Sequence, residues 1–455
     1  MTVLDLGWIR AQFPALRQEM NGHPVVFLDG PGGTQVPRRV VDAIANYLIT
    51  SNANLHGAFA TSARTDALVE RARSTVADFL GCDRDEVVFG ANMTTLTFAM
   101  SRSIAKELRP GDEIVVTSLD HDANVAPWVA LRERGIIVRT VSICEHDCTL
   151  DMLDLARQIT KRTKLVAIGY ASNAVGTINK VASVVRLARA VGAWVFVDAV
   201  HYAPHGLINV RSLDCDFLVC SAYKFFGPHV GILYGKREHL VRLQPYKPRP
   251  ASEEVPFRWE TGTQNFEGLA GVVAAIEYLA QLGEQASSQA SSMVTEPTVT
   301  DMVTEHTATD RRNALARAMV TIQEYERSLS EYLIPHLLEI PGVTLYGITN
   351  PAQFAWRTPT VGIRVAGHSP AELAKTLGDR GIFTWNGNFY ALNLTQRLGV
   401  EESGGMLRIG CTHYNTIEEL QRLLHTLHEV AVRPVRIFNR NLMFEGSQEL
   451  GSQIS

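Results

Sequence analysis

Lys224 is the residue of this chain whose surroundings most clearly indicate chemistry. It follows the apolar, strand-like run Phe217–Cys220, and a lysine held there is partly withdrawn from water. Because burial penalises the charged form of an amine, the pKa of such a lysine falls. A neutral amine can add to an aldehyde, which is how pyridoxal phosphate is held in its enzymes. Lys224 therefore predicts an aldehyde cofactor of this kind.

A carboxylate ends a second apolar run, Trp194–Asp198. Enzymes that use pyridoxal phosphate need an acid to keep the ring nitrogen of the cofactor protonated. Ligands of open parallel sheets bind at the carboxyl ends of strands, so Asp198 and Lys224 are expected at one edge of a sheet. Neither residue is decisive alone, but together they indicate the same cofactor.

Hydroxyl side chains that could hold a phosphate follow another strand. Thr94 and Thr95 come after the run Val87–Phe89 and begin a helical pattern, where free N–H groups and the helix dipole favour an anion. The same threonines could simply cap the helix. Ser221 precedes Lys224 by three residues and could donate to a phosphate or be an ordinary loop serine.

Two histidines follow strand ends and could contact a cofactor. His121 could stack on a planar ring from the face opposite Asp198, although most lone histidines in such places are hydrogen-bonded surface residues. His201 could reach a cofactor oxygen or be structural. His201 and His205 have the spacing of a helical metal pair, but Pro204 between them breaks such a helix, so no metal site is expected.

Arg408 stands in the apolar run Met406–Ile409. A buried guanidinium needs an anionic partner, and a substrate carboxylate could bind it through two hydrogen bonds. The alternative is a structural salt bridge. The segment Cys144–Cys148 has the appearance of a metal or redox loop, but its spacing matches no common zinc signature, and we interpret it as a polar connection.

Short apolar runs alternate with helical patterns from about residue 85 to 235. The strand candidates are Val87–Phe89, Glu113–Thr117, Ile136–Val141, Leu165–Gly169, Trp194–Asp198, Phe217–Cys220 and Gly231–Tyr234. Amphipathic segments near 95–108, 122–134, 151–160 and 181–191 separate them. Strands that alternate with helices predict an α/β fold with a mainly parallel central sheet and helices on both of its faces.

The rest of the chain indicates a second, smaller α+β domain. Its predicted elements are a long helical pattern over about 312–340 and strands at Thr360–Val365 and Met406–Ile409. A segment rich in Ser, Thr and Ala precedes it and is interpreted as a surface insertion without chemistry. The predicted division is a large domain at 20–283, the insertion at 284–310, the small domain at 311–433 joined by the N-terminal segment 1–19, and a tail at 434–455.

Bulk properties exclude several classes of function. The chain has 455 residues, of which 46% are hydrophobic, so it can bury a full core. A net charge of −4 without a basic run argues against nucleic acid or an anionic membrane as a partner. There is no signal-peptide pattern or membrane-length apolar run, and the six cysteines form no secreted framework. A cytoplasmic protein is predicted.

Several stretches closely resemble the class V aminotransferase family, which belongs to the fold type I pyridoxal phosphate enzymes, and within it the cysteine desulfurase and selenocysteine lyase branch. The resemblance runs from about residue 25 to 430. The stretches that carry it are 27–34, 52–56, 119–128, 171–179, 260–265 and 413–419. Their number and order are specific for the family, and they imply the fold of the type I transferases.

The resemblance also implies roles for the cofactor-binding candidates. Lys224 would form the Schiff base and move the α-proton, Asp198 would pair with the pyridine nitrogen, and His121 would stack on the ring. The other contacts would be Thr94, Thr95 and Ser221 at the phosphate, and Asn173 and His201 near the ring hydroxyl. Thr263 would reach the phosphate of the neighbouring subunit, which implies a homodimer with shared active sites.

On the substrate side, Arg408 would bind the carboxylate of an amino acid. His56 and Asn388 are expected near the substrate, and either His56 or Tyr390 could supply a further acid or base. The desulfurases usually have Gln at the position of His201 and His at that of Tyr223, so the tyrosine puts one phosphate contact in doubt.

A larger departure concerns the reaction. Desulfurases carry a cysteine on the loop before the arginine strand, and its thiolate attacks the substrate sulfur. The corresponding stretch here, Thr384–Ala391, contains no cysteine, and Cys411 is a poor substitute because it lies past the arginine strand. We therefore expect an enzyme that acts on an amino acid through an external aldimine, by β-elimination of the C–S lyase type. The alternatives are transamination or epimerisation, true cysteine desulfuration, and a non-catalytic binding protein of the same fold.

Overall fold

The centre of the molecule is a seven-stranded sheet. The structure, a computed structural model, describes residues 4–292 and 308–432. From one edge to the other, the strands are β4 (Val87–Gly90), β12 (Gly231–Gly235), β11 (Phe217–Ser221), β10 (Trp194–Asp198), β9 (Thr163–Gly169), β5 (Glu113–Thr117) and β6 (Ile137–Val141). Strand β12 is antiparallel to β11 and β4, and the other pairs are parallel. The predicted mainly parallel sheet is confirmed.

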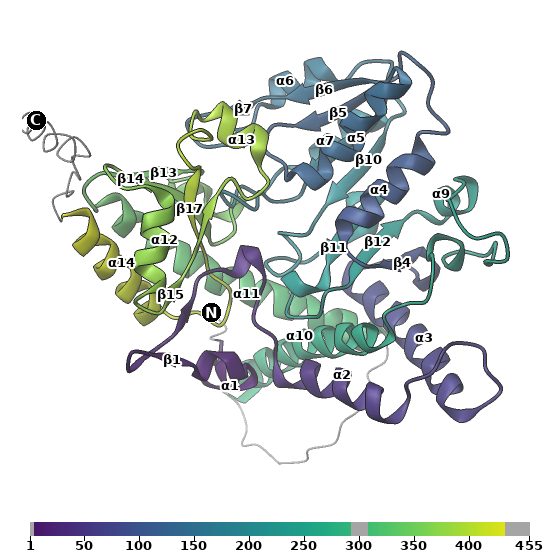
Figure 1. Cartoon of the computed structure of the whole chain (residues 1–455), viewed down its shortest axis with the longest axis horizontal. Coiled ribbons are helices and arrows are strands. Elements are labelled where there is room, and N and C mark those ends of the chain that lie inside the picture. The colour runs from purple at the N-terminus through teal and green to yellow at the C-terminus, as the bar shows by residue number, and fades with distance from the viewer. Residues whose placement is uncertain (1–3, 293–307, 433–455) are drawn as a thin grey trace, which may run out of the picture.

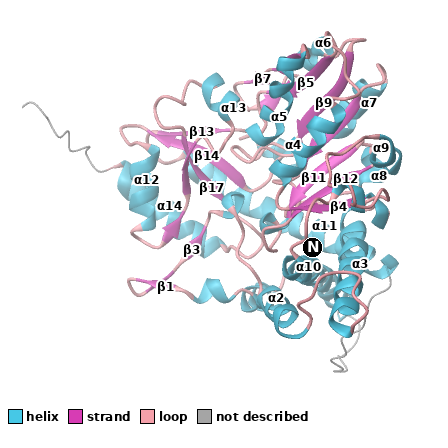
Figure 2. Ribbon diagram, turned by 45° about the vertical axis from the view of Figure 1, so that its right-hand side comes forward, coloured by secondary structure: helices cyan, strands magenta, loops and turns pink. Residues whose placement is uncertain are grey.

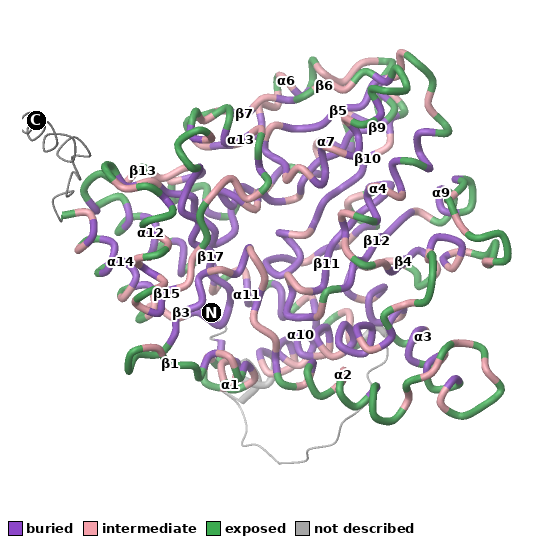
Figure 3. Tube along the Cα trace, in the orientation of Figure 1, coloured by how far each residue is buried: buried purple, intermediate pink, exposed green. Residues whose placement is uncertain are grey.

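Both faces of this sheet are covered because alternate residues of each strand enter different cores. In β10, for example, Val195 and Val197 belong to one apolar cluster and Phe196 to the other. The first core includes residues of α3 (Ala60–Leu80), α7 (Val181–Arg189), α10 (Phe266–Ser292) and α11 (Ala308–Leu338). The second includes residues of α4 (Met93–Ile104). Figure 3 shows β11 and β12 buried along their length.

The helix predicted over 122–134 is broken into three short pieces. A 3₁₀ turn at Asp122–Asn124 is followed by α5 (Ala126–Val129) and a second 3₁₀ segment at Ala130–Arg134. Pro127 lies in the first turn of α5, and because proline lacks the N–H of a continuous helix, the earlier turn cannot run through it.

A separate four-stranded antiparallel sheet forms the smaller α+β unit, and Figure 2 shows it well apart from the first sheet. Its order is β13 (Val343–Tyr346), β14 (Thr360–Val365), β17 (Met406–Gly410) and β16 (Trp385–Gly387). Helices α12 (Pro370–Gly378) and α14 (Ile417–Ala431) pack with it, and both begin with a capping box. The smaller α+β unit places Arg408 on its third strand.

The remaining elements connect or flank these two sheets. They are α1 (Leu6–Gln12), β1 (Glu19–Met20), β2 (His23–Pro24), β3 (Val26–Phe27), α2 (Arg38–Thr50), β7 (Ile143–Cys144), β8 (Thr149–Leu150), α6 (Met152–Gln158), α8 (Val210–Leu213), α9 (Arg237–Arg242), β15 (Ile382–Phe383) and α13 (Leu392–Arg397). Short 3₁₀ segments lie at 14–17, 30–32, 84–86, 222–224, 257–259 and 351–356.

Helix α11 joins the two cores. Its residues from Ala314 to Ile322 pack in the core of the large sheet, whereas those from Leu329 to Leu337 pack in the core of the small sheet. The division at 20–283 and 311–433 stays a prediction, and so does the role of segment 1–19, whose Ile9 and Phe13 enter the large core. Of the predicted insertion 284–310, residues 293–307 lie outside the described residues, as does the tail 434–455.

Candidate active site

Lys224 lies on the connection between the antiparallel strands β11 and β12, and its backbone is held in place there. Lys224 ends a 3₁₀ turn, and Phe226 follows in the left-handed region with a φ of 71°. The N–H of Phe226 donates to Oγ1 of Thr34 at 2.9 Å, and Nζ of Lys224 donates to the carbonyl of Pro31. Burial, together with repulsion from Arg408, lowers the pKa of Lys224 to about 7.

Asp198 lies on the neighbouring strand, at its carboxyl end. It pairs in register with Gly169 of β9 and Val219 of β11, and only 7% of its surface is exposed. Its Oδ1 accepts a hydrogen bond from the N–H of Val200 at 2.9 Å. Burial raises the pKa of this carboxyl to about 7, and the Lys224 charge opposes the rise. The sheet thus brings together the two residues that the sequence singled out first.

His121 lies on the loop after β5, and a buried aspartate shapes that loop. Asp120 accepts hydrogen bonds from Thr117 Oγ1 at 2.7 Å, Gly169 N at 2.8 Å and Asn124 Nδ2 at 3.0 Å. The Nδ1 atom of His121 accepts from the Ala123 N–H at 3.0 Å, so the proton of the neutral ring is on Nε2.

Two positive groups face His121. Burial and the charges of Lys224 and Arg408 lower the pKa of its imidazole to about 4, so the ring is uncharged at neutral pH. The effect of both charges on His121 indicates that the three residues lie close together, although His121 and Lys224 follow strands of the large sheet and Arg408 lies in the small one. An uncharged ring is suited to stack on an aromatic cofactor.

Arg408 is buried on β17 with 5% of its surface exposed. Its Nη1 donates to the carbonyl of Asn173 at 3.0 Å, while its Nε has no hydrogen-bond partner among the described residues. Burial lowers the pKa of this guanidinium to about 9, and Asp29 acts in the opposite direction. Within residues 4–292 and 308–432, no carboxylate forms an ion pair with Arg408.

The loop before β17 lies against this group. The guanidinium carbon of Arg408 is 4.3 Å from the centre of the Phe389 ring. Tyr390 stacks on His121 with ring centres 5.3 Å apart and an angle of 22° between the planes. Asn388, one of the predicted substrate contacts, donates from its amide to Glu401 at 2.9 Å. Phe389 and Tyr390 therefore border the site.

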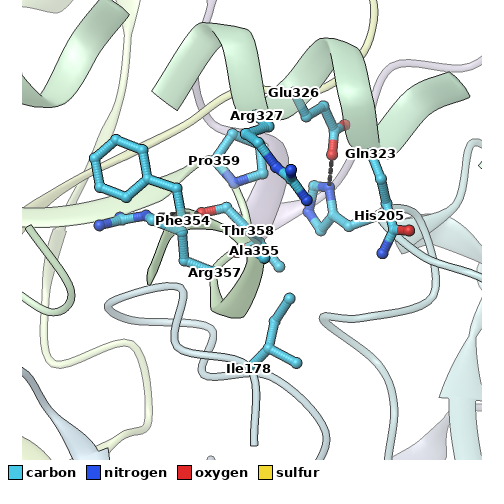
Figure 4. A pocket seen from close by; sticks show the side chains of 10 residues that line it. All are labelled: Ile178, His205, Gln323, Glu326, Arg327, Phe354, Ala355, Arg357, Thr358 and Pro359. Carbon is cyan, nitrogen blue, oxygen red and sulfur yellow. Dashed lines mark hydrogen bonds and ion pairs between the residues drawn. The ribbon is translucent and has the colours of Figure 1, made fainter. Parts of the chain in front are cut away.

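His201 is buried beside Thr358 and His205, two residues that line a small pocket of about 80 Å³. Its Nε2 is 3.1 Å from Oγ1 of Thr358, and its ring meets that of His205 edge to face with centres 5.2 Å apart. Figure 4 shows His205 bonded to Glu326 at the pocket wall, with Nδ1 to Oε2 at 2.8 Å. Burial holds the pKa of His201 well below its usual range. No group of three metal-ligating side chains forms within the described ranges.

The predicted phosphate contacts surround the start of α4. The N–H of Met93 donates to Oγ of Ser221 at 3.0 Å, which fixes this serine beside the helix N-terminus. Asn92 caps the helix by accepting from the Thr95 N–H at 2.9 Å, and Thr95 Oγ1 bonds back to the Asn92 carbonyl. Thr94 is half-buried beside them. Thr95 thus serves the helix end, and the contact of both threonines with a phosphate stays a prediction.

Two predicted residues, His56 and Thr263, are exposed and form no hydrogen bond with the other candidates among the described residues. His56 lies on the loop between α2 and α3, with 78% of its side chain exposed and its Nδ1 3.3 Å from Asp66. Figure 1 shows this loop at the opposite end of the molecule from β17. Thr263 is exposed on the loop that precedes α10.

Sequence reasoning missed three residues of the site. Asp29, whose pKa burial raises to about 6, is close enough to Arg408 and Lys224 to be stabilised by their charges. Asp29 and Asp120 each follow an apolar run, and this signal could have identified them. Phe389 had no comparable signal, because its contact with Arg408 depends on the fold alone.

The polar groups left open here fit the expected pyridoxal phosphate. Lys224 supplies an amine of lowered pKa for the aldehyde, and Asp198 a buried carboxyl for the ring nitrogen. Oδ1 of Asn173 is buried without a partner among the described residues, as suits a contact with a ring substituent. The positive end of the α4 dipole lies beside Ser221 and favours an anion such as a phosphate.

Comparison with known proteins agrees with this geometry. The family model described as Aminotransferase class-V matches residues 26–309 and 313–423. The cysteine desulfurase of Pectobacterium atrosepticum is 30% identical over 439 residues, which span 93% of this chain and 97% of that protein. The probable cysteine desulfurase of Mycolicibacterium paratuberculosis is 31% identical over 94% of this chain, which spans 58% of that longer protein.

Solved structures show the same likeness. The apo cysteine desulfurase of Thermococcus onnurineus NA1 has a TM-score of 0.80 and 26% identity, and the match covers 94% of this chain and 98% of that one. The cysteine desulfurase CsdA of Escherichia coli, in its S-sulfonic acid form, has a TM-score of 0.77 and 26% identity, with the same coverage of both chains. The fold and the cofactor predicted from the sequence are thus confirmed, and the chain belongs to the class V aminotransferase family of pyridoxal phosphate-dependent enzymes.

Proposed function

We propose that this enzyme removes a sulfur substituent from the β-carbon of an amino acid by elimination, without passing sulfur to a thiol of its own. The observation that carries this proposal is the loop before β17, where Asn388, Phe389 and Tyr390 border the site and no cysteine is present. Its relatives are named cysteine desulfurases, so the substrate class is expected to be shared.

The cysteines of the chain support the same view. All six are free, and none belongs to the 384–391 loop. Cys411, the one nearest to Arg408 in the sequence, is fully buried in the small apolar core with Leu407 and Ile409. Burial raises the pKa of its thiol far above the usual range, which disfavours a nucleophilic thiolate there.

The proposed roles follow from the surroundings of each residue. Pyridoxal phosphate, when bound, draws electrons from the α-carbon of an amino acid. Lys224 would take the proton from that carbon, since a pKa near 7 allows an amine to gain and lose a proton at neutral pH. Asp198 would hold a proton at the ring nitrogen, and Arg408 would bind the α-carboxylate in a bidentate manner.

The assembly proposed for this function is a homodimer. His56 and Thr263 are exposed, and the loop that carries His56 lies at the opposite end of the molecule from β17, which suits residues that serve the site of a second subunit. The free state of all six cysteines supports the predicted cytoplasmic location, because thiols stay reduced there. No helix among the described residues has the length and apolar character needed to cross a bilayer.

The test is a product analysis with L-cysteine and S-substituted cysteines. Elimination converts the substrate and one water into pyruvate, ammonia and sulfide or the corresponding thiol, and we expect pyruvate and thiol in equal amounts. Alanine together with a persulfide on the protein, detected by alkylation and mass spectrometry, would instead identify desulfuration. A different keto acid would indicate transamination, and a racemised substrate would indicate epimerisation.

Lys224→Ala is the control variant for every one of these assays. We expect it to lose the visible absorption band of the bound cofactor and to form none of the products, a loss of at least about a thousandfold in rate. If amino acids never change the band of the unaltered protein, the chain is a binding protein and the enzyme proposal fails.

A further inference from the structure

The aromatic ring of Phe389 lies against the guanidinium that is proposed to bind the substrate. The carbon Cζ of Arg408 is 4.3 Å from the ring centre, within the range of a cation–π contact. On another side, Nη1 donates to the Asn173 carbonyl at 3.0 Å. Nε has no partner among the described residues, and the structure gives Nη2 no hydrogen bond in that part of the chain either.

These contacts leave one edge of the guanidinium buried but without a hydrogen-bond partner among the described residues. A carboxylate binds arginine in the plane of the group, through two parallel N–H···O bonds. The pair Nε and Nη2 forms such an edge, whereas Nη1 is engaged with Asn173 and one side of the group is covered by the ring. A ring stacked on the face of a guanidinium leaves the N–H groups of its edges available to a carboxylate.

The backbone that presents Phe389 is strained and held in place. Phe389 and Tyr390 both have a φ of 57°, a region that costs about 1–3 kcal/mol for residues other than glycine. Three hydrogen bonds hold it: Asn173 Nδ2 to the Phe389 carbonyl at 2.9 Å, Asp122 N–H to the Tyr390 carbonyl at 2.7 Å, and Tyr390 N–H to Asn388 Oδ1 at 3.0 Å.

A second set of contacts anchors the loop from behind. The Asn388 amide donates to Glu401 at 2.9 Å, and the other carboxylate oxygen of Glu401 accepts from Thr395. Both ends of the Asn388 amide are therefore used within the protein. Strained conformations persist where the surrounding structure over-determines them, and they gather at ligand sites. The loop is built to hold an aromatic ring at this place.

We propose that Phe389 is a positioning residue, which holds the Arg408 guanidinium so that its Nε and Nη2 edge receives the α-carboxylate of the substrate. The proposal rests on the role proposed above for Arg408. Phe389 makes the site prefer α-amino acids over amines of the same side chain that lack the carboxylate. It acts through Arg408 and takes no part in proton transfer.

Phe389→Leu tests this role, because leucine keeps an apolar side chain but removes the π face. Spectral titration of the cofactor band gives dissociation constants for an α-amino acid and for its decarboxylated amine. A desolvated cation–π contact is worth about 1–2 kcal/mol, so we expect amino-acid binding to weaken roughly 5- to 30-fold. Binding of the amine and the value of kcat should change less than about twofold, and Phe389→Tyr should restore the affinity.

The matched control is Phe383→Leu. Phe383 is a half-buried phenylalanine whose ring packs against Phe27 with centres 5.4 Å apart, and among the described residues it has no cation–π contact with Arg408. We expect both dissociation constants to stay unchanged in this variant. Phe389→Met carries the same expectation as the leucine variant and replaces it if leucine abolishes cofactor binding.

The outcomes separate this inference from the proposed function. If Arg408→Leu weakens amino-acid binding but Phe389→Leu does not, the positioning role is wrong while the role of Arg408 stands. An equal loss for the amino acid and the amine, or a failure of Phe389→Tyr to restore affinity, would reduce Phe389 to a packing residue. If Arg408→Leu has no effect on amino-acid binding, the proposed role of Arg408 fails first.

Discussion

Two buried arginines of this molecule have similar surroundings except for their charged partner. Arg73 on α3 lies over the rings of Phe89 and Phe257, with distances of 5.4 and 4.8 Å to the ring centres, much as Arg408 lies over Phe389. Arg73, however, forms a bidentate pair with Glu260, at 2.6 and 2.8 Å. No described carboxylate pairs with Arg408 in this way.

This difference indicates that Arg73 has a structural role, whereas Arg408 is available to bind an anionic ligand. Glu260 also accepts the Phe89 N–H at 2.9 Å, so the Arg73 pair ties β4 to the start of the loop that carries Thr263. Every charge in that pair is compensated within the chain. At the candidate active site, the charges of Arg408, Lys224 and Asp198 are buried with less compensation, and their pKa values shift accordingly.

The largest effect on stability is expected from Arg73→Leu. This change leaves the Glu260 carboxylate, whose side chain is 5% exposed, without its counter-charge. Removing one member of a buried pair costs about 3–5 kcal/mol, and we expect that loss in the free energy of unfolding measured with denaturant. The double variant Arg73→Leu with Glu260→Leu should recover part of it. A loss below about 1 kcal/mol would show that this pair is not structural.

Asp198→Asn tests a buried charge of the candidate active site, which has less compensation within the chain, in the protein without cofactor. The folded pKa of Asp198, about 7, lies above its ordinary value of 3.8. The folded state therefore favours the protonated carboxyl, and this contribution to stability is complete below about pH 4 and is lost as the pH rises through 7. Since one pKa unit corresponds to about 1.4 kcal/mol, the loss is up to about 4 kcal/mol.

The asparagine variant lacks that titration. We expect it to be more stable than the unaltered protein above pH 7 and to approach it below pH 5, as measured by thermal unfolding of both cofactor-free proteins. Adding pyridoxal phosphate should stabilise the unaltered protein more than the variant, because only the carboxylate can hold a proton at the ring nitrogen. If the difference in stability between the two proteins does not change with pH, the pKa of Asp198 is not raised by folding.

The predictability of the fold from sequence differs between its parts for a physical reason. The strands Glu113–Thr117, Trp194–Asp198 and Thr360–Val365 have the bounds that the sequence predicted, because short apolar runs of β-forming residues mark buried strands. Helices α2 and α3 were not assigned, although they pack against α10. They precede the alternation of strands and helices on which the fold prediction depended.

The residues of the candidate site also differ in how well the sequence predicts them. Lys224 and Asp198 could be found because Asp198 closes an apolar strand and Lys224 follows one closely, so a local pattern carries the signal. The contact between Asn173 and Phe389 joins residues 216 positions apart, and that of His205 with Glu326 spans 121. Such partners have no local pattern, since they depend on how the two sheets and α11 come together.

Arg408→Leu completes the comparison and should have the smallest effect on stability. The substitution removes a charge that has no carboxylate partner among the described residues, and it places leucine in a strand between Leu407 and Ile409. It also leaves the buried Asn173 carbonyl without its donor, a cost of about 1 kcal/mol that the relief of the buried charge offsets. We expect the free energy of unfolding of the cofactor-free protein to change by less than about 1 kcal/mol, while amino-acid binding to the loaded enzyme weakens. If Arg408→Leu costs as much stability as Arg73→Leu, then Arg408 is held by the protein alone, and the substrate carboxylate must bind elsewhere.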